Sequence, residues 1–182
     1  MLTIVVPGTE KFNEATSEFV YTKEQKLQLE HSLLSLSKWE SRWHKPFLSS
    51  KKNPKSQEEI IDYIRCMTIT QNVDPNVYYN LTQANCDKIQ AYIDDPMTAT
   101  TFNELQKAKP STEIITSELI YYWMIAYNVP VEFEKWHLNR LLTLIKVCSI
   151  KNTPPKKMSK REIMNRNAAL NASRRKAHNS KG

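Results

Sequence analysis

The chain has 182 residues, with 26 Lys and Arg against 19 Asp and Glu and a hydrophobic content of 40%. It contains only two glycines, Gly8 and Gly182, whereas loops that cradle phosphates need several for close backbone approach. A P-loop, a dinucleotide-binding fingerprint and a G-x-S-x-G nucleophile elbow are therefore excluded. This length favours one domain with a tail.

The positive charge is confined to the carboxy-terminal end. Residues 151–182 hold ten basic side chains and one acidic one, a net charge of +9, whereas residues 1–150 hold 16 basic and 18 acidic ones, a net charge of −2. Apolar residues also become sparse after residue 150, so the segment buries too little surface to offset its ordering entropy. We predict a helical body over 1–150 and a basic, mobile or marginally helical tail over 151–182, whose helix starts at the capping-box pattern Ser159–Glu162.

No secretory or membrane-spanning segment is evident. Met1–Gly8 has no basic region and no long apolar stretch, as a signal peptide would. The longest apolar run, Leu119–Tyr127, is nine residues, against about 20 needed to cross a bilayer. We expect a soluble, cytoplasmic protein.

The amino terminus predicts a small β hairpin. Leu2–Val6 is apolar and β-branched, Pro7-Gly8 punctuates the chain, and Glu18–Tyr21 follows as a second short strand. We expect these two strands to pair with each other and to lie on helices, because a lone hairpin is marginal in water.

The rest of the body predicts helices, marked by capping-box patterns at Thr22–Gln25 and Ser56–Glu59 and by Asp-Pro pairs that suit helix starts. The expected helices are Lys23–Trp43, one after Ser56, short ones after Asp74 and Asp95, Gln83–Ile93, Thr116–Tyr127 and Pro130–Ile150. One face of the first should comprise Leu29, Leu33, Leu36, Glu40 and Trp43, and one face of the second Ile60, Ile61, Ile64 and Met67. The fold class is therefore mainly α: a compact helical domain with a small N-terminal β hairpin and a basic C-terminal extension.

Signatures of catalysis and metal binding are weak. His137 follows Glu134 by three residues on an expected helix, so an imidazole and a carboxylate could meet there, and a small hydrolase is one alternative. Such a polar pair is ordinary on a helix, and no nucleophile accompanies it. Cys66, Cys86 and Cys148 form no C-x-x-C and are expected to be buried free thiols. The four His and three Cys do not cluster as zinc ligands do, so we expect no enzyme, no cofactor and no metal.

Two aromatic clusters are the candidate partner-binding residues. Trp39, Trp43 and Phe47 recur every four residues, and Tyr121 and Tyr122 belong to a run of four aromatics within seven residues. Tryptophan and tyrosine dominate interface energetics, which favours an anchor for a partner. Aromatics at helical spacing are also ordinary core residues, so core and interface both stay open.

The basic tail has three candidate ligands: nucleic-acid phosphates, acidic lipid or an acidic protein. The tail has no aromatic residue to enter a membrane, and the sequence shows no recognisable base-reading module. The alternative function is a nucleic-acid-binding accessory protein that acts through this tail. The candidate contact residues are Lys156, Lys157, Lys160, Arg161, Arg166, Arg174, Arg175 and Lys176.

Several segments together resemble a known family. They are Ser37–Ser41 with Trp43 and Pro46–Leu48, Asp62–Met67, Asp95–Thr100, Trp136–Leu141, and Asn171–Lys176 with the ending Lys181-Gly182. The chain resembles the tail assembly chaperones of long-tailed bacteriophages over most of its length. None of these segments is a catalytic signature.

The resemblance implies a non-enzymatic protein that binds the tape-measure protein while it is soluble and helps to recruit tail-tube subunits. It implies residence in the host cytoplasm and absence from the mature virion, and it is compatible with a homo-oligomer. Grooves for amphipathic helices are what such a task requires. Many members are made in two lengths by a translational frameshift, so the basic tail is either a terminus or the junction to an extension.

Overall fold

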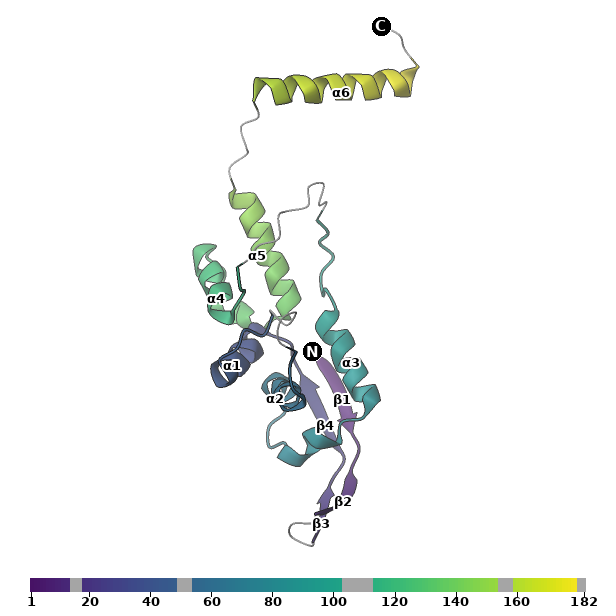
Figure 1. Ribbon diagram of the computed structural model, residues 1–182, viewed down its shortest axis with the longest axis vertical. Helices are drawn as coiled ribbons and strands as arrows, with labels where there is room; N and C mark the ends of the chain where they lie inside the picture. Colours follow the sequence, from purple (N-terminus) through teal and green to yellow (C-terminus); the bar gives the residue numbers. More distant parts are fainter. Residues whose placement is uncertain (14–17, 49–53, 103–112, 154–158, 180–182) are drawn as a thin grey trace. The chain divides into compact units, whose positions relative to one another are not determined.

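The computed structural model describes residues 1–13, 18–48, 54–102, 113–153 and 159–179 (Figure 1). It is mainly helical with small N-terminal antiparallel β hairpins, which confirms the predicted fold class. Backbone contacts divide the chain into two units, Met1–Ser149 and Ile150–Gly182. None of the helices within the described ranges is long and apolar enough to cross a membrane.

The elements in chain order are β1 (Leu2–Val6), β2 (Thr9–Asn13), β3 (Glu18–Thr22), β4 (Gln25–Leu29), α1 (Leu33–Trp43), α2 (Gln57–Met67), η1 (Pro75–Asn80), α3 (Gln83–Asp94), α4 (Ser117–Ala126), η2 (Val131–Lys135), α5 (Leu138–Asn152) and α6 (Lys160–His178).

The amino-terminal strands form two antiparallel pairs, β1 with β4 and β2 with β3. The expected pairing of Leu2–Val6 with Glu18–Tyr21 is therefore wrong. Leu2 lies opposite Leu29 and Thr9 lies opposite Thr22, so the residue numbers of facing positions add up to the same value in both pairs. The four strands thus form one long hairpin with a single register. Pairing is interrupted for two residues on each arm, at the level of Pro7-Gly8, because proline has no N–H to donate.

The expected helix Lys23–Trp43 is wrong in its first part, because Gln25–Leu29 is β4. Leu27 and Leu29 alternate with more exposed Gln and Lys and face the core, which is the period of a strand. The capping box at Thr22 does not form, since the Thr22 hydroxyl lies 2.9 Å from that of Thr9 and accepts a bond from Asn80. Helix α1 starts at Leu33, with Ser32 as N-cap and a reciprocal capping box to Ser35.

The second edge of β4 is covered by the last residue of α2 and the residues that follow it. The Glu30 amide donates to the Met67 carbonyl at 2.9 Å, and the Ile69 amide donates to the Gln28 carbonyl at 2.8 Å. Both edges of β4 are thereby hydrogen-bonded, which a two-stranded hairpin alone does not provide.

The capping-box and Asp-Pro signals had mixed outcomes. The Ser56–Glu59 box forms and starts α2, and Asp74 caps η1 by accepting from the Asn76 amide. The expected helix after Asp95 is wrong, because residues 96–102 are not helical and Asp95 instead terminates α3, its Oδ1 accepting from the Met97 amide at 2.8 Å.

The expected helix Pro130–Ile150 is divided into η2 and α5. The chain becomes extended at Trp136, and His137 forms a β-bridge with Ser32. The Leu138 amide then donates to the His31 carbonyl at 2.7 Å, which fixes the start of α5 against the segment that precedes α1.

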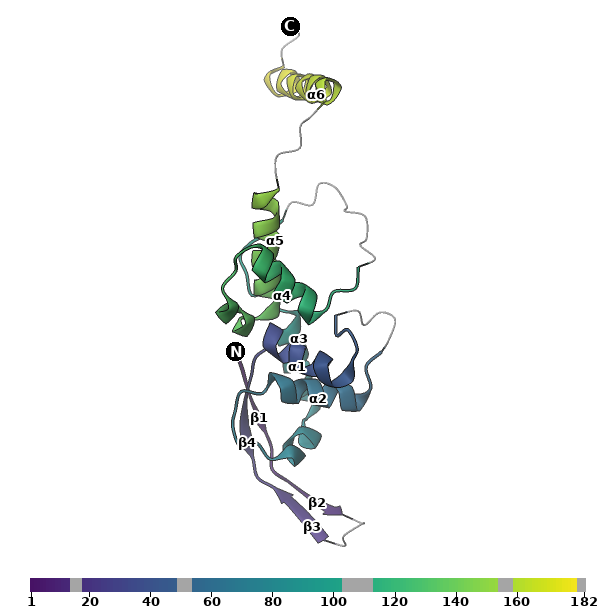
Figure 2. The same cartoon turned by 90° about the vertical axis from the view of Figure 1, so that its left-hand side faces the viewer.

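The core of the first unit lies between the β1–β4 pair and the helices. α1 packs against α2 and α4, and α3 packs against β1 (Figures 1 and 2). The side chains with 0% exposure are Leu27, Leu29, Leu33, Leu36, Ile120, Leu138 and Leu141. Strand β4 and helices α1, α4 and α5 therefore all contribute to one core.

Replacing Gly8 with Ala tests the break in the hairpin. A Cβ at this position would lie 2.8 Å from the Thr22 carbonyl oxygen and 3.0 Å from the Glu24 amide nitrogen, both rigid backbone atoms. We expect G8A to lower the free energy of unfolding by about 1–3 kcal/mol in urea denaturation. Thr3→Ala, at an exposed site on β1, should change it by at most about 0.5 kcal/mol. Equal stability of G8A and the parent would contradict the close approach.

Candidate functional site

A groove with a volume of about 670 Å³ is the candidate site in the described part of the chain. It is bounded by α2, by α3 and by Phe47, Leu48 and Lys55. Its apolar lining consists of Phe47, Leu48, Ile60, Tyr63, Ile64, Cys86, Ile89 and Ile93. Such a lining suits apolar side chains of a ligand.

Helical spacing explains how the two helices build the groove. Ile60 and Ile64 are four residues apart on α2, and Ile89 and Ile93 are four residues apart on α3, so each pair shares one face. Ile64 and Ile89 are buried at the base, whereas the Ile60 side chain is 49% exposed. The face predicted from Ile60, Ile61, Ile64 and Met67 is therefore shared between the core and an open groove.

The α3 side of the groove carries a polar, acidic rim. The Gln83 amide donates to Asp87 and the Gln90 amide donates to Asp94, each at 2.8 Å and four residues apart. These bonds hold two carboxylates beside the apolar lining. The rim favours a ligand with basic or neutral polar groups beside its apolar ones.

Phe47 forms an aromatic wall of the groove. Its ring stacks on Tyr63 with centroids 3.9 Å apart and meets Trp39 edge-on at 5.0 Å. The Lys55 Nζ lies 4.0 Å from the centroid of the Phe47 ring and donates to the Phe47 carbonyl at 2.9 Å. Partial burial lowers the pKa of Lys55, while nearby Glu59 opposes that shift.

The buried Glu40 carboxylate positions this wall. Its Oε1 accepts from the Phe47 amide at 2.8 Å and its Oε2 accepts from the Ser117 amide at 2.7 Å. Ser117 is the first residue of α4, where a negative charge is favoured by the helix dipole. One side chain on α1 therefore fixes both the backbone of Phe47 and the start of α4.

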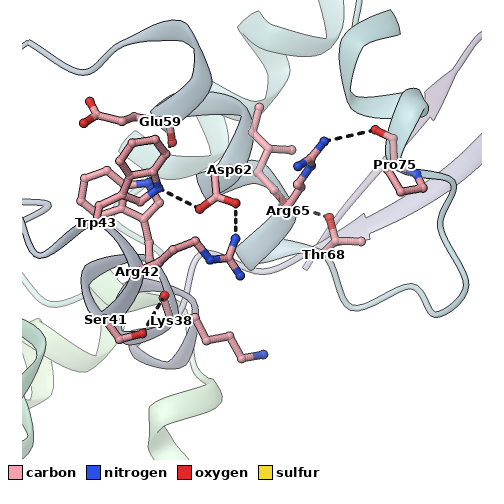
Figure 3. Close-up of polar contacts among 11 residues, drawn as sticks. Lys38, Ser41, Arg42, Trp43, Glu59, Asp62, Arg65, Thr68 and Pro75 are labelled. Atoms are coloured by element: carbon pink, nitrogen blue, oxygen red, sulfur yellow. Dashed lines mark hydrogen bonds and ion pairs between the residues drawn. The ribbon is translucent and has the colours of Figure 1, made fainter.

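A second polar network joins α1 to α2 (Figure 3). The Asp62 carboxylate accepts from the Arg42 guanidinium and, at 2.9 Å, from Nε1 of Trp43. Lys45 pairs with Glu59, and this hydrogen bond together with the Ser56 amide lowers the pKa of Glu59. These contacts fix the spacing of the two helices.

The structure separates the aromatic candidates. Trp39 is 1% exposed and belongs to the core, while Trp43 and Phe47 are half-buried against it. Of this cluster, only Phe47 lines the groove. Tyr121 and Tyr122 lie on α4: Tyr121 is half-buried, and Tyr122 is 64% exposed.

His137 and Glu134 do not share one helix, as the sequence predicted, because η2 ends at Lys135 and His137 lies in the β-bridge to Ser32. The Glu134 carboxylate accepts from the Tyr121 hydroxyl at 2.7 Å, and burial followed by this bond raises the pKa of Tyr121. His137 lies 2.9 Å, through Nε2, from the Tyr92 carbonyl, and among the described residues its buried Nδ1 has no hydrogen-bond partner. Its ring centroid is 5.2 Å from that of His31, so the structure brings two imidazoles together there.

His31 is held as a neutral imidazole. It is 2% exposed, and its Nδ1 lies 2.6 Å from the Tyr63 hydroxyl. Burial first and nearby His137 second lower its pKa from 6.5 to about 4, against a smaller opposing effect of Asp94. Within the described ranges, no group of three or more His, Cys, Asp or Glu side chains is arranged to hold a metal ion.

The expectation of three buried thiols is wrong. Cys86 is exposed on α3, and Cys66 and Cys148 are half-buried. Cys86 lies in the first turn of α3, four residues after the N-cap Thr82. Its side chain is exposed because this turn faces the open groove.

The basic candidates belong to the second unit. Lys156 and Lys157 lie outside the described residues. The others lie on α6 with exposed side chains: Lys160, Arg161, Arg166, Arg174, Arg175 and Lys176.

No protein-family model, curated protein or solved structure matches the chain.

Neither the α3 side of the groove nor Glu40 was predicted from the sequence as part of a site. Glu40 did carry a signal, because a carboxylate at an apolar position of the α1 stripe must find donors in the interior. Ile60 carried a second signal. Together with the adjacent Ile61 it gives α2 an apolar face wider than packing against one neighbouring element requires. The α3 pairing had no comparable signal, because it depends on which helix lies next to which.

Replacing Glu40 with Ala should leave the Phe47 and Ser117 amides without their acceptors. We expect E40A to lower the free energy of unfolding by about 2–4 kcal/mol in urea denaturation. Glu40→Gln keeps one acceptor oxygen and should lose less. Glu132→Ala, at an exposed site, is the control and should have little effect. If E40A were no less stable than E132A, the proposed support of Phe47 would be wrong.

The buried His31 predicts a loss of stability in acid. The unfolded chain takes up a proton at this side chain near pH 6.5 but the folded chain only near pH 4, so acid favours the unfolded state between these values. The contribution is complete above pH 6.5 and falls by about 3 kcal/mol as the pH approaches 4. His31→Gln should flatten this part of the stability profile, measured by urea denaturation at several pH values.

The control for this prediction is His178→Gln, because His178 is exposed on α6. Its profile between pH 6.5 and pH 4 should follow that of the parent. A parent profile as flat as that of H31Q would contradict the assignment.

Proposed function

We propose that the chain is a non-enzymatic tail assembly chaperone of a long-tailed bacteriophage, which holds amphipathic helices of the tape-measure protein in the groove between α2 and α3. The resemblance of the sequence supports the class of protein. The groove is the observation that carries the proposal, because it offers an open apolar surface on the body rather than a reactive centre.

The dimensions of the groove suit part of a helix. Its volume of about 670 Å³ accommodates a few large side chains, whereas a whole helix is about 10–12 Å across with its side chains. The groove therefore takes the apolar ridge of a helix, which presents anchors at i, i+3 or i+4 and i+7. The opposite face of that helix stays in water.

The walls indicate how the ligand is oriented. Ile60 and Phe47 lie on one side, and Asp87 and Asp94 lie on the α3 side. An amphipathic helix with Lys or Arg beside its apolar ridge would place those cations along α3. Segments of this composition are favoured over purely apolar ones.

The remaining parts of the proposal follow from the resemblance. The protein acts in the host cytoplasm, helps to recruit tail-tube protein to the tape-measure protein, and is absent from the mature virion. A homo-oligomer is compatible with this role.

Replacing Ile60 with Glu tests the groove. A carboxylate at the mouth would have to be desolvated against the apolar ridge of the ligand, so I60E should weaken binding of a tape-measure fragment by about tenfold or more. The measurement is the soluble yield of the fragment on co-expression, followed by titration of the purified proteins. A fragment that stays insoluble with the parent chain would refute the proposal.

Ile69→Glu is the matched control, because its side chain is 52% exposed, close to the 49% of Ile60, and does not line the groove. It should bind like the parent. An environment-sensitive dye on Cys86, in a Cys66→Ser and Cys148→Ser background, should shift its emission when the fragment binds. Equal weakening by I60E and I69E would place the binding surface elsewhere.

A further inference from the structure

Helix α6 is a strongly charged surface that the groove does not explain. It spans Lys160–His178, 19 residues or about 28 Å of helix, and the side chains described along it are exposed. It contains six Lys and Arg and one acidic residue, whereas residues 1–150 have a small net negative charge. The excess charge of the protein is therefore displayed largely on one continuous helix.

The cations surround this helix. At about 100° per residue, the six Lys and Arg project in directions that leave no gap wider than about 80° between neighbours. A helix that lies on a membrane needs an uncharged apolar face at least about 100° wide. Ile163, Met164 and Leu170 are exposed on α6, but they do not form such a face. Ile163 and Leu170 project between Arg166 and Arg174, and Met164 projects between Lys160 and Arg175.

This arrangement of cations matches a ligand that presents phosphates on more than one side of the helix. A helix lying in a groove of a nucleic-acid duplex has a phosphate backbone on each flank, and the major groove of B-DNA is about 12 Å wide, enough to admit an α-helix. A flat acidic surface would contact only part of the circumference. Asn165, Asn167 and Asn171 stand between the cations and supply groups that hydrogen-bond to base edges or sugars.

We propose that α6 binds double-stranded nucleic acid by lying in a phosphate-lined groove. The cations at both ends, from Lys160-Arg161 to Arg174–Lys176, contact the two backbones, and the uncharged side chains between them face the bases. The proposal is independent of the groove between α2 and α3, because it concerns the other unit of the chain.

The proposal is tested by measuring how the full-length chain binds four kinds of ligand. They are a DNA duplex, an RNA hairpin, the matching single strands, and vesicles of phosphatidylserine with phosphatidylcholine. We expect a duplex or hairpin to bind best, with affinity falling about 10²–10³-fold between about 50 and about 200 mM salt, as four to six phosphate contacts require. The DNA and RNA arms identify which duplex is preferred. Tighter binding to the vesicles, or no binding to either duplex, overturns the proposal.

Two matched triple variants locate the surface. The first variant combines Arg161→Gln, Arg174→Gln and Lys176→Gln. It should bind the duplex at least tenfold more weakly, and the slope of log affinity against log salt should fall by about 2 to 3. The control replaces three exposed lysines of the body, Lys23→Gln, Lys38→Gln and Lys88→Gln, with the same change in net charge. It should bind within twofold of the parent, and equal weakening by both triples overturns the proposal.

Ala169→Pro separates a helix in a groove from a merely cationic tail. The proline breaks the middle of α6 but keeps all six cations. Duplex affinity should fall at least fivefold while single-strand affinity stays within twofold, with the loss of helix checked by circular dichroism. Unchanged duplex binding overturns the proposal. I60E should bind nucleic acid like the parent, so failure here and failure of the groove are distinguishable.

Discussion

The arrangement of the body depends most directly on the two hydrogen bonds that the Glu40 carboxylate accepts. Its two oxygens accept from the Phe47 and Ser117 amides at 2.8 and 2.7 Å, so each oxygen of this buried carboxylate is hydrogen-bonded to a backbone amide. A buried carboxylate is tolerated only when its hydrogen bonds are satisfied, and here both donors come from segments that must be positioned. The stack of Phe47 on Tyr63, and thus one wall of the groove, follows from that anchoring.

The two proposed binding surfaces differ in their physical chemistry. The groove between α2 and α3 is apolar with carboxylates on its rim, whereas α6 is cationic around its circumference. Apolar burial is only weakly sensitive to salt, and phosphate binding depends on it steeply. Ionic strength therefore separates the two activities in one preparation of the protein.

The sequence predicted the mainly helical class, the start of α2, the cap of η1 and the range of α3, because those signals are local. It failed where a distant partner decided between two local possibilities. Leu29 fits both a helical stripe and a strand, and β1 makes it a strand. Asp95 precedes proline as a helix start would, but it ends α3, where its carbonyl accepts from the distant Asn139 side chain. Glu40 was placed on the buried face of α1, yet its donors are seven and 77 residues away and no spacing rule reaches them.

The interruption at Pro7-Gly8 has equal length on both arms of the hairpin, and this symmetry has an evolutionary consequence. Side chains alternate between the two faces of a strand, so the loss of one residue from one arm would turn every later side chain of that arm over. A matching loss on the opposite arm would restore the facing pairs. In homologous chains, insertions and deletions here should therefore occur as compensating pairs, and an unmatched one should coincide with a bulge.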